Sequence, residues 1–373
     1  MPYVLVLALL LSAVSITSAR ADIAVDDLTL ETSSEKVDEA KVVGGNDRGA
    51  AIAVFDDGSI IMGGGKNGGN LYLWKEDETK LKFLGTALST RERLRDSRFA
   101  ILDIAILKQA PATASLLVSY PRLTAQRCVE VVVFQFTFDR TNSKVTRGKQ
   151  WFRSQPCVPV SAVQHAAGRM EVLNSQAAYL TIGDLGFTRI DERKTRGDLG
   201  SVFLIDGKKA EKISTGHRNQ QGIVLVDKKE LLASEHGPRG GDEINLIERG
   251  VDYGWPFVTL GAPYSQGDYV IPISTGTHKG YREPLIYWVP SIAPTELVQL
   301  PKAGYGRFSN GLAMGTLREQ SLVFMEYRSG KVASQEIVDI GARIRDLEVM
   351  PNGSLVASTD DGRLIFISPS PSK

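Results

Sequence analysis

The chain has 373 residues, a formal net charge of +1 and a sequence pI near 7.7. This balance provides no excess positive charge for attracting nucleic acid or an anionic membrane surface, so we expect no nucleic-acid partner. The hydrophobic content of 42% is enough for a full core, and 36 glycines against 16 prolines are typical of a chain with many tight turns.

The first 21 residues are predicted to be an export signal. Residues 4–14 are apolar apart from Ser12, a run too short for a membrane-spanning helix of about 20 residues. Ala19-Arg20-Ala21 follows as a small-residue site and predicts cleavage before Asp22. No Lys or Arg precedes the apolar run, so a buried strand or a retained anchor is the alternative. We expect a mature periplasmic or secreted protein with no stable membrane insertion.

The two cysteines, Cys128 and Cys157, are expected to form a disulfide, because an isolated pair in an exported protein favours one. Their spacing fits neither a CxxC redox motif nor a zinc site. Two unpaired buried thiols are the alternative.

Short apolar or alternating runs between turn residues predict an all-β fold. Four segments have the pattern strand, tight turn, strand: residues 51–62, 170–181, 223–234 and 347–358. Their turns, at residues 58, 176, 229 and 353, are separated by 118, 53 and 124 residues, which fits two, one and two units of about 60 residues. We therefore predict a six-bladed β-propeller of four-stranded antiparallel blades over residues 22–373, with residues 22 to about 45 as a polar lead-in. A β-sandwich pair is the alternative, but it predicts no single repeat length.

Polar residues are densest in two runs separated by one predicted strand and its turn. The first run is His217-Arg218-Asn219-Gln220-Gln221-Gly222, and the second begins Glu235-His236-Gly237-Pro238. Tyr253-Gly254-Trp255-Pro256 comes soon after. Both runs are expected on loops at one end of a blade, where binding groups gather on a rigid scaffold. Turn chemistry and solvated charge explain the Gly and Asp residues, but not this density of His, Arg, Asn and Trp.

These motifs resemble those of the PQQ-dependent soluble aldose (glucose/sorbosone) dehydrogenases. HRN-x-QG, EHGP, GDEIN and YGWP occur in order and at the family's spacing. A weaker resemblance covers most of the mature chain, best from about residue 160. It implies a six-bladed propeller that oxidises an aldose at the anomeric carbon with PQQ and calcium, and passes electrons to an external acceptor.

The resemblance also implies individual roles. His165 resembles the general base, and Arg218 and Asn219 resemble cofactor contacts beside the reacting carbonyl. The remaining assignments are calcium ligands (the backbone carbonyls of Gly237 and Pro238 at a catalytic site, Glu243 and Tyr253 at a structural site), further cofactor contacts (Tyr264, Arg318, Arg343 and Arg345) and a substrate-side wall at residues 287–294.

The chemistry of PQQ suits these residue types. PQQ is a planar tricarboxylate o-quinone, and arginines at i and i+2 of one strand would point the same way and bind carboxylates bidentately. Calcium prefers oxygen ligands, including backbone carbonyls. A neutral imidazole can remove a sugar hydroxyl proton at neutral pH. His217 and His236 are expected to be structural or to support the residues that contact the ligand, because the family assigns neither a catalytic role.

The chain departs from the family pattern in three places. The family has Gly-Gln-Gly-Gly before Leu-Leu-Asp, but here residues 96–100 are Asp-Ser-Arg-Phe-Ala, with Ser97 too short to replace the glutamine. Arg318 stands where the family has Lys, and residues 295–297 replace a Ser-Gly pair. A non-catalytic propeller that binds a sugar or a protein is therefore the alternative function.

Overall fold

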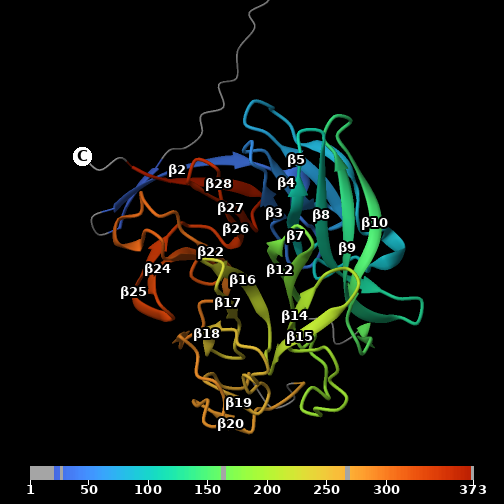
Figure 1. Ribbon diagram of the computed structural model, residues 1–373, viewed down its shortest axis with the longest axis vertical. Coiled ribbons are helices and arrows are strands. Elements are labelled where there is room, and N and C mark those ends of the chain that lie inside the picture. Colours follow the sequence, from blue (N-terminus) through green and yellow to red (C-terminus); the bar gives the residue numbers. More distant parts are fainter. Residues whose placement is uncertain (1–20, 26–27, 161–164, 265–268, 371–373) are drawn as a thin grey trace, which may run out of the picture.

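The computed structural model describes residues 21–25, 28–160, 165–264 and 269–370, so all but the last residue of the predicted export signal (residues 1–21) lies outside the described residues. Six antiparallel sheets surround a central axis, which confirms the predicted six-bladed propeller (Figure 1). Within the described ranges the only helices are short 3-10 turns, among them η1 (Asp38–Ala40), η2 (Thr90–Glu92) and η4 (Gly306–Phe308). None of these helices has the length and apolar character needed to cross a membrane.

Each blade begins with the strand nearest the axis. The first three blades are β3 (Ala51–Val54), β4 (Ile60–Gly64), β5 (Asn70–Trp74) and β6 (Lys82–Thr86); β7 (Asp103–Gln109), β8 (Thr113–Leu123), β9 (Cys128–Asp139) and β10 (Lys144–Arg153); and β12 (Ala167–Asn174), β13 (Ala177–Ile182), β14 (Ser201–Ile205) and β15 (Ala210–Thr215). The last three are β16 (Gln220–Val226), β17 (Glu230–Glu235), β18 (Asp242–Leu246) and β21 (Ile286–Trp288); β22 (Pro294–Gln299), β23 (Leu312–Thr316), β24 (Ser321–Arg328) and β25 (Lys331–Asp339); and β26 (Ile344–Val349), β27 (Leu355–Thr359), β28 (Arg363–Pro369) and β2 (Leu28–Lys36). Short additions are β1 (Ala21–Val25) beside β2, β11 (Val158–Pro159) beside β9, and the pair β19 (Val258–Thr259) and β20 (Ser274–Thr275).

The four repeats expected from the sequence are the first two strands of four blades. They are β3–β4, β12–β13, β16–β17 and β26–β27. The blades that start with β7 and β22 fill the two double-length gaps. Turn chemistry combined with alternating apolar residues was therefore enough to predict the repeat.

The last blade is completed by the N-terminal part of the chain. β2 pairs with β28 from Leu30↔Pro369 to Lys36↔Arg363, so strands from both ends of the chain share one sheet. The expected polar lead-in at residues 22 to about 45 is therefore wrong in part, because nine of those residues form the outer strand β2. Only Leu28 and Leu30 of this strand are buried apolar residues, which explains its polar composition.

The hydrophobic core is divided into six clusters, one between each pair of neighbouring blades. Aromatic pairs contribute to several of them, for example with ring centroids 5.7 Å apart for Phe55–Phe138, 4.9 Å for Phe152–Phe203 and 5.0 Å for Trp74–Phe366. The blades therefore pack face to face around the axis and leave their loops available at the two ends.

A buried polar network joins all six inner strands at the axis. Arg169 of β12 is 1% exposed, and its Nη1 lies 2.8 Å from Asp346, 3.2 Å from Glu296 and 3.7 Å from Asp103. These carboxylates come from β26, β22 and β7, and they also accept backbone N–H bonds from Ile52, Ile223 and Met170 on β3, β16 and β12. A cavity of about 290 Å³ lies along the axis between the same strands.

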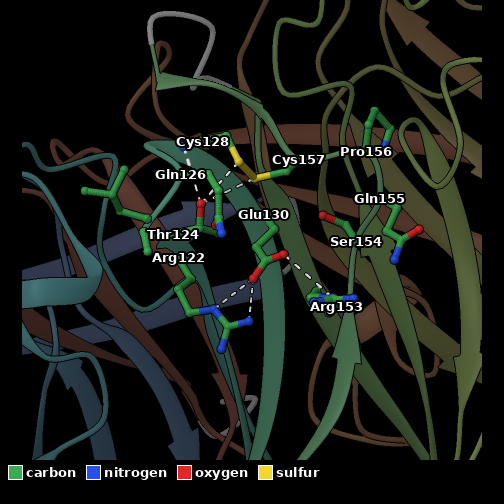
Figure 2. A pocket seen from close by; sticks show the side chains of 12 residues that line it. Arg122, Thr124, Gln126, Cys128, Glu130, Arg153, Ser154, Gln155, Pro156 and Cys157 are labelled. Atoms are coloured by element: carbon green, nitrogen blue, oxygen red, sulfur yellow. Dashed lines mark hydrogen bonds and ion pairs between the residues drawn. A yellow bond between two sulfur atoms is a disulfide. The ribbon is translucent and has the colours of Figure 1, made fainter.

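Cys128 and Cys157 form a disulfide, as expected from the sequence. Figure 2 shows it at the edge of a pocket beside the ion pairs of Glu130 with Arg122 and Arg153. The bridge joins the start of β9 to Cys157, which directly precedes β11 and lies eight residues before His165 in the chain. It therefore anchors the segment that leads into the candidate active site.

Removing the disulfide is expected to destabilise the fold. The bridge closes a loop of 29 residues, for which chain entropy predicts a loss of about 3–4 kcal/mol when both cysteines become serine. Urea unfolding of the double variant should show a lower midpoint, and reduction of the wild type should reproduce it. Thiol counting on the denatured, unreduced wild type should detect no free thiol, and an unchanged midpoint in both experiments would reject a stabilising role.

Candidate active site

The mouth of the propeller contains a histidine paired with a buried carboxylate. His165 lies just before β12, with its backbone in the left-handed region at φ 51°. Its Nδ1 is 3.0 Å from Oδ1 of Asp184, which is fully buried just after β13. The indole N–H of Trp255 donates to Oδ2 of Asp184 at 2.8 Å, and the Tyr269 hydroxyl donates to the same oxygen. The carboxylate therefore fixes the imidazole ring in one orientation.

The surroundings of Asp184 keep it ionised. Burial by itself would raise the pKa of Asp184, but the charges of His165 and Arg218 and the hydrogen bonds from His165 and Tyr269 lower it overall. Burial raises the pKa of the Tyr269 hydroxyl, so this group remains a donor. Because an ionised carboxylate can only accept, Nδ1 of His165 holds the proton and Nε2 offers its lone pair.

Arg218 brings the two polar runs of the sequence together. It is 4% exposed on the loop before β16. Its Nη2 lies 3.2 Å from Nε2 of His165, and its Nη1 donates to the carbonyl of Gly237 at 2.8 Å. Its guanidinium carbon lies 5.4 Å from the ring of Trp255. Burial tends to lower the pKa of Arg218, but Tyr269 and Asp184 raise it overall, so it is a permanent cation beside the imidazole.

His217 and His236 stabilise the polar loops of this blade through buried hydrogen bonds. His217 is buried between Ser214 and Glu235, at 2.9 and 3.1 Å, and His236 contacts the carbonyl of Pro294 at 2.7 Å. Burial lowers the pKa of His236 to about 4, so it is neutral. These positions agree with the structural role expected for both histidines. Asn219 is buried next to Arg218.

A small cavity lies beside the residues expected to bind structural calcium. Its volume is about 20 Å³, enough for one ion or water molecule. Glu235, Glu243, Thr259, the backbone of Gly237 and Tyr253 are among its lining residues. The phenol of Tyr253 donates to the carbonyl of Leu246 and stacks on His217, so only its backbone could contact an ion. Calcium prefers oxygen groups of this kind, but Arg218, His236 and His278 line the same cavity.

The carboxylate of Glu243 already has two protein partners. Asn245 donates to it at 2.9 Å, and His278 lies 3.2 Å from it. Burial alone would lower the pKa of His278, but Glu243 raises it to about 9, so His278 supplies positive charge at this point. Among the described residues, no three His, Cys, Asp or Glu side chains are arranged as a metal site. A calcium ion here would therefore depend on backbone carbonyls and would displace the His278 contact.

Arg343 and Arg345 point to the same side of the chain, as expected for the pair. Nε of Arg343 donates to Asp360 at 3.0 Å, and Nε and Nη2 of Arg345 donate to the same carboxylate at 2.9 and 2.8 Å. Both line a pocket of about 980 Å³. Arg318 does not line this pocket and lies 3.9 Å from Glu319, and the half-exposed Tyr264 is also absent from its lining.

Two departures from the family pattern contribute to the core instead of the mouth. Phe99 is fully buried in the cluster between the second and third blades. Thr295 donates to the carbonyl of Ile344, and Glu296 belongs to the axial network. In the expected substrate wall, Tyr287 is half exposed, whereas Trp288 is buried and donates to Gln335.

Asp184 and Tyr269 were not predicted as site residues from the sequence. Asp184 stands at a strand end between Gly183 and Leu185, a position that also suits an ordinary turn residue. Tyr269 belongs to the long connection between β18 and β21 and reaches the site only through folding. A local motif could identify neither residue, because each acts on His165 across a gap of 19 or 104 residues.

The fold and this site define a propeller of the sugar-dehydrogenase class, and comparison with known proteins agrees. A model of the glucose/sorbosone dehydrogenase family matches residues 46–366, and the chain belongs to this family. It is 32% identical to aldose sugar dehydrogenase YliI of Escherichia coli over 247 residues, which are 61% of this chain and 66%, just under two thirds, of that protein.

Solved structures agree on the architecture. The apo form of the soluble aldose sugar dehydrogenase of Escherichia coli superposes with a TM-score of 0.76 at 22% identity, covering 91% of this chain and 99% of that one. The PQQ-bound aldose sugar dehydrogenase of Streptomyces coelicolor gives a TM-score of 0.67 at 18% identity, covering 91% and 98%. At these identities the two structures support the fold.

Proposed function

We propose that the protein oxidises aldose sugars at the anomeric carbon, using PQQ and calcium, and that it passes the electrons to an external acceptor in the periplasm or outside the cell. The observation that best supports this function is the convergence of His165, Asp184 and Arg218 from separate segments at one end of the propeller. Family membership and the PQQ-bound relative favour the same chemistry.

The site residues would have distinct roles in the oxidation. PQQ, when bound, would supply the two-electron acceptor. His165 would take the proton of the anomeric hydroxyl at Nε2, while Asp184 stabilises the resulting imidazolium through Nδ1. Arg218, already next to Nε2, would place positive charge beside the reacting groups, and Asn219 would assist it as a cofactor contact.

Calcium would be held by oxygen groups at two places. The carbonyls of Gly237 and Pro238 are proposed for the catalytic ion, with Glu243 and the backbone of Tyr253 for the structural ion. Gly237 is already fixed in position, because its N–H donates to Asp242 at 3.0 Å. Tyr264 and Arg318 are proposed as further cofactor contacts, and residues 22–373 as the mature single-domain propeller.

The proposed function is tested by titrating purified mature protein with PQQ, with calcium and with a chelator. We expect PQQ binding at micromolar concentration that requires calcium, followed by aldose-dependent reduction of an artificial dye. Calcium should also raise the melting temperature of the chelator-treated protein, because a ligand of the folded state stabilises it by mass action. No PQQ binding in the presence of calcium would overturn the enzymatic function.

A non-catalytic sugar- or protein-binding propeller is the second candidate. The bonding of both Arg343 and Arg345 to Asp360 favours it, because an internal carboxylate takes the place expected for the cofactor. The same titration separates the two functions, since a binding module would show no calcium-dependent uptake of PQQ.

A further inference from the structure

The pocket beside Arg343 and Arg345 contains more positive charge than its own carboxylates neutralise. Its cationic lining residues are Lys41, Arg48, Arg98, Arg343 and Arg345, and its carboxylates are Asp47, Asp360 and Asp361. The carboxylates already have partners: Asp47 pairs with Lys41 at 3.1 Å, Asp360 with Arg343 and Arg345, and Asp361 with Arg363 at 2.7 Å. The pocket is therefore suited to an additional anion.

Arg48 is the cation without a partner. Its guanidinium makes no hydrogen bond or ion pair with the described part of the chain, and its Nε is buried without an acceptor. Burial and the nearby charges of Arg345 and Arg169 lower the pKa of Arg48 to about 9. The nearby charges of Asp360 and Asp346 offset only part of this effect. A guanidinium nitrogen that is buried without an acceptor is unfavourable unless an anion joins it.

Arg98 reaches the pocket from a different segment. It is half exposed, and its Nη2 lies 2.6 Å from Asp96. The backbone N–H of Ser97 donates to the carbonyl of Gly44 at 3.0 Å, which holds this turn against the segment before Arg48. Two glycines separate the glutamine from Leu-Leu-Asp in the family pattern, and counting back from Ile101 places Arg98 at that position. This corrects the comparison of Ser97 with the glutamine.

We propose that Arg48 and Arg98 bind a carboxylate of the cofactor, together with Arg343 and Arg345. This inference rests on the proposed function and assigns two further binding residues. A guanidinium binds a carboxylate through two parallel N–H bonds, which an amide cannot match in charge. The two arginines would compensate for the part of the Arg345 guanidinium that Asp360 occupies.

The test measures PQQ affinity by isothermal titration with calcium present, so the readout does not depend on turnover. Arg48→Met and Arg98→Gln should each weaken binding by about 10-fold or more, the loss typical of one charge-assisted hydrogen bond. Arg48→Lys should retain part of the affinity. Arg189→Met, which removes an exposed ion pair with Glu192, is the matched control and should bind as the wild type does.

Measuring the melting temperature of each variant distinguishes weaker PQQ binding from misfolding. Because Arg48 has no partner, Arg48→Met should melt at the same temperature as the unliganded wild type or higher. If the folded variants bind PQQ as tightly as the wild type, the inference is wrong and the proposed function stands. If the wild type binds no PQQ, both are overturned.

Discussion

Replacing His165 by alanine is expected to reduce aldose oxidation by about 10²–10⁴-fold, the usual contribution of a positioned general base. PQQ affinity should change little, because the proposed anchors of its carboxylates lie on other segments. Asp184→Asn should lose activity in the same range. An amide cannot stabilise the imidazolium, and its N–H₂ group can favour the wrong tautomer of His165.

Single-turnover reduction of bound PQQ by a saturating aldose separates this loss from weaker binding. Tyr269→Phe removes one of the two side-chain donors to Oδ2 of Asp184 and leaves the indole of Trp255 in place. It should therefore lower kcat by much less than Asp184→Asn, with a small change in KM. An Asp184→Asn protein that folds, binds PQQ and turns over at the wild-type rate would exclude the proposed role of the carboxylate.

The architecture could be predicted from the sequence because each blade starts with a local pattern. The turns at residues 58, 176, 229 and 353 are set by neighbouring residues, and the structure places a strand pair around each of them. The role of β2 could not be predicted in this way. Its partner β28 is more than 300 residues away, and its composition is that of a polar segment.

The candidate site was predictable only where motifs are contiguous. Arg218 and Gly237 belong to dense polar runs, and the structure joins them directly. Asp184 and Arg48 have no local motif, since one looks like a turn residue and the other like an exposed arginine. Asp184 stands out because it is buried and paired with His165, and Arg48 because its buried Nε has no acceptor. Both properties depend on contacts that form only in the folded chain.

The axial network gives the largest expected change in stability. Arg169 contacts Asp103, Glu296 and Asp346 together, and its Nη2 also donates to the carbonyl of Arg345 at 2.9 Å. Removing one partner from a buried ionic group leaves uncompensated charge and typically costs about 3–5 kcal/mol. We expect a loss of this size for Arg169→Met, which preserves most of the side-chain volume.

The loss should depend on pH in a defined direction. Burial raises the pKa of Asp103 to about 7, with Arg169 opposing the rise, whereas the pKa in the unfolded chain is about 3.9. Between about pH 3.9 and 7 Asp103 is protonated in the folded state and ionised in the unfolded state. Its contribution to the free energy of unfolding is therefore most favourable in acid and decreases as the pH rises towards about 7. Without Arg169 the pKa of Asp103 rises further.

Arg169→Met should therefore be more destabilising at pH 8 than at pH 5, where protonated carboxyls need no cation. Urea unfolding at both pH values measures the difference, and Arg189→Met, which breaks an exposed pair, should leave the unfolding midpoint almost unchanged at either pH. Adding Asp346→Asn to Arg169→Met removes one uncompensated carboxylate and should recover part of the loss at pH 8. Equal losses at pH 5 and pH 8, with no recovery in the double variant, would show that Arg169 stabilises the axis by packing alone and not by neutralising the carboxylates of the inner strands.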